Sequence, residues 1–167
     1  MPEHDTERPR PFASPPCYAH EFEPQEAPLL TAAEVAVRLN DLLEGERAGA
    51  RGLLDMQAGD DAALAGLLAE VARDEARFCA MLARHLSRLG HAPSRQTGAF
   101  YAKLAARPTL QDKLRLLDRG QRAVVRLLDE LLPSVEDAAL RDDLLEMRDT
   151  HVRNIKRCAA YLDAWPI

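Results

Sequence analysis

Apolar residues recur at helical spacing in four long segments, and the connections between these segments differ in length. The segments cover roughly residues 31–57, 61–89, 109–132 and 136–163. The first two are joined by the turn 57–60, and the last two by Pro133 and Ser134. Connections this short make each pair fold back as an antiparallel hairpin. The stretch 90–108 between the hairpins holds about 18 residues, enough to run the length of a bundle even with a short helix near 97–103.

The second predicted hairpin repeats the sequence of the first. A block that begins Gly-x-Arg-Ala at Gly45 recurs 75 residues later, at Gly120. A block that begins Asp-Ala-Ala-Leu at Asp61 recurs 76 residues later, at Asp137. Two blocks in the same order with nearly equal offsets favour duplication over chance. We therefore predict an all-α, four-helix bundle of two pseudo-symmetric helical hairpins joined by a long crossover.

The N-terminal residues 1–28 differ in composition from the rest of the chain. They hold seven of the 11 prolines and lack apolar periodicity, which predicts a flexible arm. Residues 29–167 then form one domain, and with 47% apolar residues in the chain it can bury its own core. The three cysteines Cys17, Cys79 and Cys158 are widely spaced, which fits reduced thiols.

Charge and hydropathy exclude several classes of partner. The net charge is −5 without a positive stripe, so nucleic acid is not an expected partner. No apolar run in the sequence approaches the roughly 20 residues needed to span a bilayer. The N-terminus also lacks the features of a signal peptide. We expect a cytoplasmic protein with no membrane partner. No motif for a nucleotide cofactor and no nucleophile–base pair is recognisable, so the sequence predicts no catalytic residue.

Each helical segment interrupts its buried apolar stripe once, near its middle, with a polar residue. These residues are Glu46, Glu75, Gln121 and His151. Their distances from the hairpin turns agree within about one helical turn, and the repeat aligns Glu46 with Gln121 and Glu75 with His151. We expect all four to lie at one level of the core. Two carboxylates buried there cost several kcal/mol unless a positive charge accompanies them.

The inward carboxylates, the hairpin pattern and the repeat resemble the ferritin-like superfamily. Its carboxylate-bridged metal proteins place a Glu on each of two helices and Glu-x-x-His on each of the other two. The strings 46–51, 74–82, 97–101 and 119–121 are also similar to a bacterial branch of that superfamily, over about residues 30–165. The resemblance implies the bundle fold and places metal ligands at Glu46 and Glu75, but it implies no particular activity.

The sequence departs from the six-ligand pattern of that superfamily. Phe78 stands where the first His belongs, and Gln121 replaces the third Glu. His151 either fills the last His position, with Arg148 in the Glu position before it, or fills that Glu position itself, with Asn154 following. The full ligand set of a two-metal centre is therefore absent.

Two hypotheses follow for these core residues. In the first, Glu46, Glu75 and His151, with Gln121 as a weak carbonyl ligand, bind one Fe, Mn or Zn ion. In the second, Arg148 or protonated His151 neutralises the carboxylates, and the amides of Gln121 and Asn154 complete a structural polar layer. The protein would then be a non-catalytic bundle used for dimerisation or protein interaction. We expect a homodimer because such bundles commonly pair through a helix face.

Overall fold

The computed structural model describes residues 27–165, so almost all of the predicted arm 1–28 lies outside the described residues. The described part is helical, and its elements are α1 (Ala32–Leu54), α2 (Ala62–Arg88), α3 (Phe100–Ala105), α4 (Leu110–Leu131), the 3₁₀ turn η1 (Leu132–Ser134) and α5 (Ala138–Asp163). The predicted all-α class is confirmed. The ends of the four long helices lie within three residues of the predicted ends.

Side-chain caps determine where the four long helices begin. Thr31, Asp61, Thr109 and Asp137 each accept a hydrogen bond from the backbone N–H three residues further along. Such caps satisfy backbone donors that a helix leaves free, and each is worth about 1 kcal/mol.

Gly59 (φ 60°) lies in the turn before α2, and Gly90 (φ 77°) follows the end of α2. Both adopt the left-handed conformation that glycine accepts without strain.

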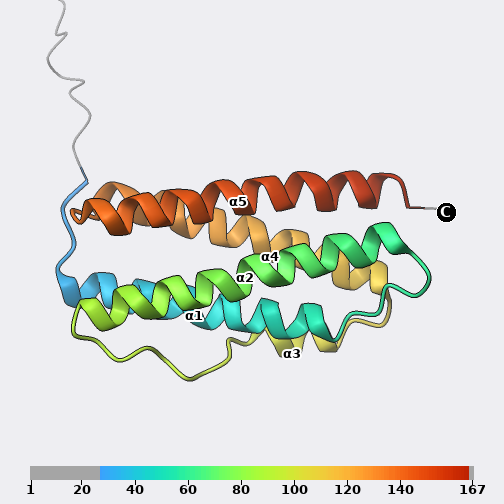
Figure 1. Cartoon of the computed structure of the whole chain (residues 1–167), viewed down its shortest axis with the longest axis horizontal. Helices are drawn as coiled ribbons and strands as arrows, with labels where there is room; N and C mark the ends of the chain where they lie inside the picture. The colour runs from blue at the N-terminus through green and yellow to red at the C-terminus, as the bar shows by residue number, and fades with distance from the viewer. Residues whose placement is uncertain (1–26, 166–167) are drawn as a thin grey trace, which may run out of the picture.

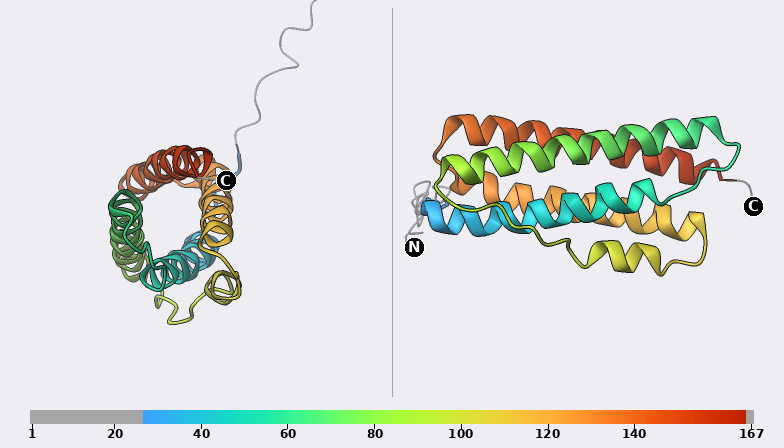
Figure 2. Two further views of the ribbon diagram at one scale, coloured as in Figure 1. Left: turned by 90° about the vertical axis from the view of Figure 1, so that its right-hand side faces the viewer. Right: turned by 60° about the horizontal axis from the view of Figure 1, so that its bottom comes forward.

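The four long helices surround a common core (Figures 1 and 2). α1 packs along α2 and α4 along α5, as antiparallel hairpins, and α2 also contacts α5. The buried apolar residues form two clusters. One includes Leu39, Phe78 and Met147, and the other includes Leu68, Leu114 and Cys158. On every long helix the two clusters lie on opposite sides of the polar residue that interrupts the apolar stripe.

The crossover between α2 and α4 is anchored along α1. The Arg47 guanidinium donates to the carbonyl oxygens of Gln96 and, at 2.9 Å, Ser94. The backbone N–H of Ser94 donates to Asn40 Oδ1 at 2.7 Å, and that of Gly98 donates to the Glu44 carbonyl at 3.0 Å. These bonds bring the short helix α3 against α1 and α4, outside the ring of long helices (Figure 2).

Two glycines let α3 lie close to the bundle. A Cβ atom at Gly52 would meet the Leu104 side chain at 2.4 Å, and one at Gly120 would meet the Phe100 ring at 2.8 Å. Glycine in a helix interior costs about 0.5–1 kcal/mol relative to alanine, so its presence here follows from close packing.

Among the described helices, none combines the length and the apolar character needed to cross a membrane.

We expect Gly45→Ala to stabilise the protein and Gly120→Ala to lack that gain. A Cβ atom at Gly45 meets no described atom within 4 Å, so alanine should add about 1 kcal/mol through helix propensity alone. At Gly120 the same gain is offset by the Phe100 ring, which should leave that variant about 1–2 kcal/mol less stable than Gly45→Ala. Urea unfolding measures both changes. Equal effects would show that Phe100 does not rest on α4.

Candidate functional site

Four buried polar side chains meet between the two apolar clusters, and we call them the polar layer. They are Glu46 from α1, Glu75 from α2, Gln121 from α4 and His151 from α5. Each is between 1% and 4% exposed. The structure thus brings together the four residues that interrupt the apolar stripes. Each long helix contributes one of them, from the middle of its buried stripe.

The polar layer consists of two hydrogen-bonded pairs. His151 Nε2 lies 3.1 Å from Glu46 Oε1, which links α5 to α1. Gln121 Nε2 donates to Glu75 Oε1 at 2.6 Å, which links α4 to α2. Each pair therefore joins one hairpin to the other. The bonds also connect residues that the sequence repeat does not align with each other.

The surroundings of His151 determine where its protons lie. Its Nδ1 atom is 2.9 Å from the Met147 carbonyl oxygen, which can only accept, so Nδ1 carries a hydrogen. The contact between Nε2 and the Glu46 carboxyl group also needs a proton, because neither an unprotonated Nε2 nor an ionised carboxylate can donate. Burial by itself would lower the pKa of His151, but the charge of Glu46 and its hydrogen bond offset burial and raise that pKa above its ordinary value.

Glu75 is held without a cation among the described residues. Its hydrogen-bond partner is the neutral amide of Gln121. Burial, and then the charge of Glu46, raise the pKa of Glu75 well above its ordinary value. A Cβ atom at Gly49 would lie 1.9 Å from Glu75 Oε2, so the carboxyl group occupies space that only a glycine leaves free. Gly49 was not predicted as a site residue, although a glycine in a helix interior is a sequence signal of close approach.

Three acceptor oxygens in the polar layer lack a hydrogen-bond partner among the described residues. They are Glu46 Oε2, Glu75 Oε2 and Gln121 Oε1. A buried acceptor without a donor costs about 1–3 kcal/mol, and more when it is charged. The polar layer therefore has unused capacity for a cation or for a hydrogen-bond donor.

The prediction that Arg148 neutralises the polar layer is wrong. Arg148 points outward and pairs with Asp129 and Asp149. Asn154 is buried, but it donates to Asp74 Oδ2 at 3.1 Å instead of to either glutamate of the layer. Of the two cations predicted for the layer, only His151 is present there. Phe78, where the sequence resemblance led us to expect a histidine ligand, packs beside His151 with their ring centroids 5.6 Å apart.

The described cysteines are not suited to bind a cation. Cys79 is half-buried and Cys158 is buried, and both are free thiols. Burial is the main cause that raises the pKa of Cys79 to about 12 and that of Cys158 to about 11, so both stay protonated. Cys17 lies outside the described residues. Within residues 27–165, no three side chains of the His, Cys, Asp and Glu types converge on one point that could hold a metal ion.

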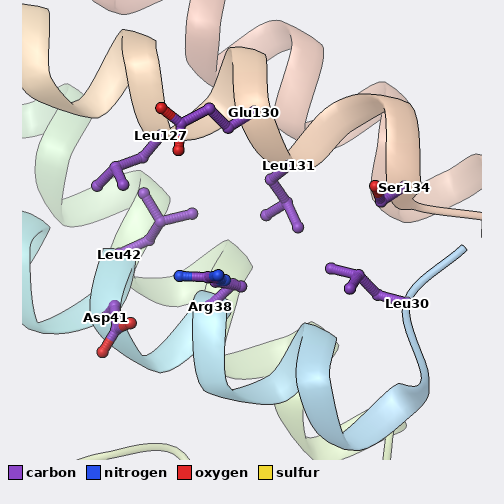
Figure 3. Close-up of a pocket in the computed structure, with 8 residues that line it drawn as sticks. All are labelled: Leu30, Arg38, Asp41, Leu42, Leu127, Glu130, Leu131 and Ser134. Carbon is purple, nitrogen blue, oxygen red and sulfur yellow. The ribbon is translucent and has the colours of Figure 1, made fainter. Parts of the chain in front are cut away.

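Two hollows lie along the seam between α1 and α4. One of about 190 Å³ borders the polar layer, and Glu46, Glu75 and Gln121 are among its lining residues. The other, of about 180 Å³, lies towards the start of α1 and is shown in Figure 3. There the side chains of Leu42 and Leu131 face each other across the seam, with Arg38, Asp41 and Glu130 at the rim. Leu127 lines both hollows.

Comparisons with known proteins identify the fold and the family, but they indicate no activity. The structure is similar to the crystal structure of a conserved hypothetical protein, Rv2844, from Mycobacterium tuberculosis, with a TM-score of 0.71 and 19% sequence identity over 82% of this chain and 96% of that chain. At this identity the likeness shows the fold alone. No curated protein matches the sequence. The sequence model of the family described as "Domain of unknown function (DUF6306)" matches residues 33–160, which include the whole polar layer, and the chain therefore belongs to this family.

Proposed function

We propose that this protein is a ferritin-like bundle that binds one divalent Fe, Mn or Zn ion in its polar layer. The observation that supports this is the group of three buried acceptor oxygens without a donor among the described residues. A self-sufficient structural layer would be expected to pair its own buried polar atoms. The pattern of two hairpins joined by a crossover, with one polar residue from each long helix, supports the ferritin-like assignment and its pseudo-symmetry.

The donor atoms of the layer suit such an ion. Two carboxylates, one imidazole and one amide carbonyl are ligands that Fe(II), Mn(II) and Zn(II) accept. His151 is already oriented as metal-binding histidines usually are, because its Nδ1–H donates to the Met147 carbonyl and leaves Nε2 for the ligand. Iron or manganese there would supply redox chemistry, and zinc would supply Lewis-acid chemistry.

A metal ion would take the place of protons that the layer now holds. One such proton lies between His151 and Glu46, and the raised pKa of Glu75 favours a second on that carboxyl group. Since the side chains now bond to each other and do not converge on one point, Glu46 and Glu75 must turn from their present partners to bind the ion. We therefore expect metal affinity to rise with pH.

A second candidate function is a non-catalytic bundle that dimerises or binds a protein partner. The two hydrogen-bonded pairs favour it, because they hold the hairpins together without a metal. The hollow in Figure 3 offers such a surface, since Leu127 is 43% exposed at its edge and Leu30, Leu42 and Leu131 line it. Mass measurement in solution at micromolar concentration tests the homodimer.

We expect metal-free protein to bind about one Mn(II) or Zn(II) ion per chain, and we expect Glu75→Gln to weaken this binding on the order of 100-fold. The variant removes a charged ligand but keeps the shape and the bond from Gln121. Calorimetric titration and elemental analysis measure the binding. The matched control is Glu70→Gln, because Glu70 is also on α2 but pairs with Arg157 at the surface. Less than about one-tenth of an ion per chain, with no thermal stabilisation by added metal, would exclude the proposal.

The stability of the metal-free protein should fall as pH rises. Glu75 and His151 both have pKa values raised above their ordinary 4.5 and 6.5, so the folded protein binds more protons than the unfolded chain above those values. The free energy of unfolding therefore decreases with pH, from about 4.5 upward for Glu75 and from about 6.5 upward for His151.

Glu75→Gln should flatten this profile, because the amide cannot ionise. At pH 9 we expect the variant to be about 1–2 kcal/mol more stable than the native protein, while at pH 5 the two should be similar. Urea unfolding at stepped pH, with a chelator present, measures both profiles. Parallel profiles would show that Glu75 is not the group that titrates.

A further inference from the structure

The cavity of about 190 Å³ beside the polar layer lies between α1 and α4, and the Phe100 ring of α3 forms part of its wall. Gly45 leaves open space on α1, while Gly49 and Gly120 let the Glu75 carboxyl group and the Phe100 ring come close to the long helices. The helix α3 lies outside the ring of long helices (Figure 2). Pockets for drug-sized ligands measure roughly 300–1,000 Å³, so an occupant of this cavity must be smaller.

The wall of the cavity is apolar except for two acidic side chains and one amide. Leu117, Val124 and Leu127 make most of it apolar. Among the described residues that line the cavity, the ionisable ones are Glu46 and Glu75, and none is basic. Glu46 has His151 as a partner, whereas Glu75 has only the Gln121 amide.

Other charged groups near Glu75 do not supply the missing positive charge. Asp74, beside it on α2, adds negative charge and raises the pKa of Glu75 further. His151, from α5, is bonded to Glu46. The cavity therefore combines an apolar body with one acidic end that lacks a cation among the described residues.

We propose that this cavity binds a small organic amine, with its ammonium group on Glu75 and its apolar part against Phe100, Val124 and Leu127. A primary ammonium group carries one positive charge and hydrogen-bond donors, and Glu75 Oε2 is a buried acceptor without a donor among the described residues. A charged hydrogen bond to a buried carboxylate is roughly twice as strong as a neutral one. A carboxylic acid of the same size would instead place like charges together.

This inference uses the same layer as the proposed metal site but does not require a metal. Because both cations use Glu75, the amine and Mn(II) should compete.

The test is calorimetric titration of the full metal-free chain with n-butylamine, 1-butanol and butyrate, which share size but differ in charge. We expect n-butylamine to bind at least about 10-fold more tightly than 1-butanol, because of the charged bond to Glu75. Butyrate should show no binding. Equal binding of n-butylamine and 1-butanol, or no binding of n-butylamine, would overturn the proposal.

Variants locate the bound amine. Gly45→Leu places a side chain in the cavity where a Cβ atom meets no described atom within 4 Å, so it should reduce n-butylamine binding at least about 10-fold without loss of folding. Ala123→Leu, on the opposite wall, should do the same and serves if the first variant does not fold. Glu75→Gln should also lose the amine, while the surface control Glu70→Gln should retain it. Unchanged binding in both cavity-filling variants would place the amine elsewhere and refute the inference.

The same variants separate this inference from the metal proposal. Gly45→Leu fills the cavity but leaves every proposed metal ligand in place, so Mn(II) binding should be unchanged in it. Binding of n-butylamine without any Mn(II) binding would support the amine site and exclude the metal site. Mn(II) binding without n-butylamine binding would do the reverse.

Discussion

Two glutamates buried at one level of the core are the constraint on which the rest of the structure depends. Glu46 and Glu75 are each at most 3% exposed, and the imidazole of His151 is hydrogen-bonded to Glu46, whereas Glu75 is bonded to the amide of Gln121. Charges this deep are stable only when protons, metal ions or donors accompany them. In the polar layer, Glu46 has the imidazole of His151 as its partner, whereas Glu75 has only the neutral amide of Gln121. The proposed cation site rests on the acceptors of the layer that have no donor among the described residues.

The layer also has a structural role between the hairpins. Within each hairpin the helices pack along their length, and the two hydrogen-bonded pairs cross from one hairpin to the other. Beside the polar layer, the seam between α1 and α4 is lined by glycines of both helices and by Phe100 of α3. This seam therefore contains the space beside the polar layer, and a ligand could reach the layer there without opening either hairpin.

Much of the fold could be predicted because helices are encoded locally. The caps Thr31, Asp61 and Asp137 and the apolar periodicity specify each helix, and the number of residues between a polar residue and its hairpin turn sets the height of that residue. Arg148 could not be placed in the same way. It is three residues from His151, but its long side chain reaches an acidic residue on the surface of α4, and a helical pattern does not show which neighbour is nearer.

The sequence by itself determined the helices, their order and the four polar residues of the layer at mid-helix, since periodicity and capping act within a few residues. Only the tertiary structure decided that His151 pairs with Glu46 and Gln121 with Glu75, because these partners are 105 and 46 residues apart. It also decided that Phe100 rests on Gly120 and that a cavity remains beside Glu75. These features depend on the distance between helices and on the rotation of each about its axis, which arise when all the side chains pack together.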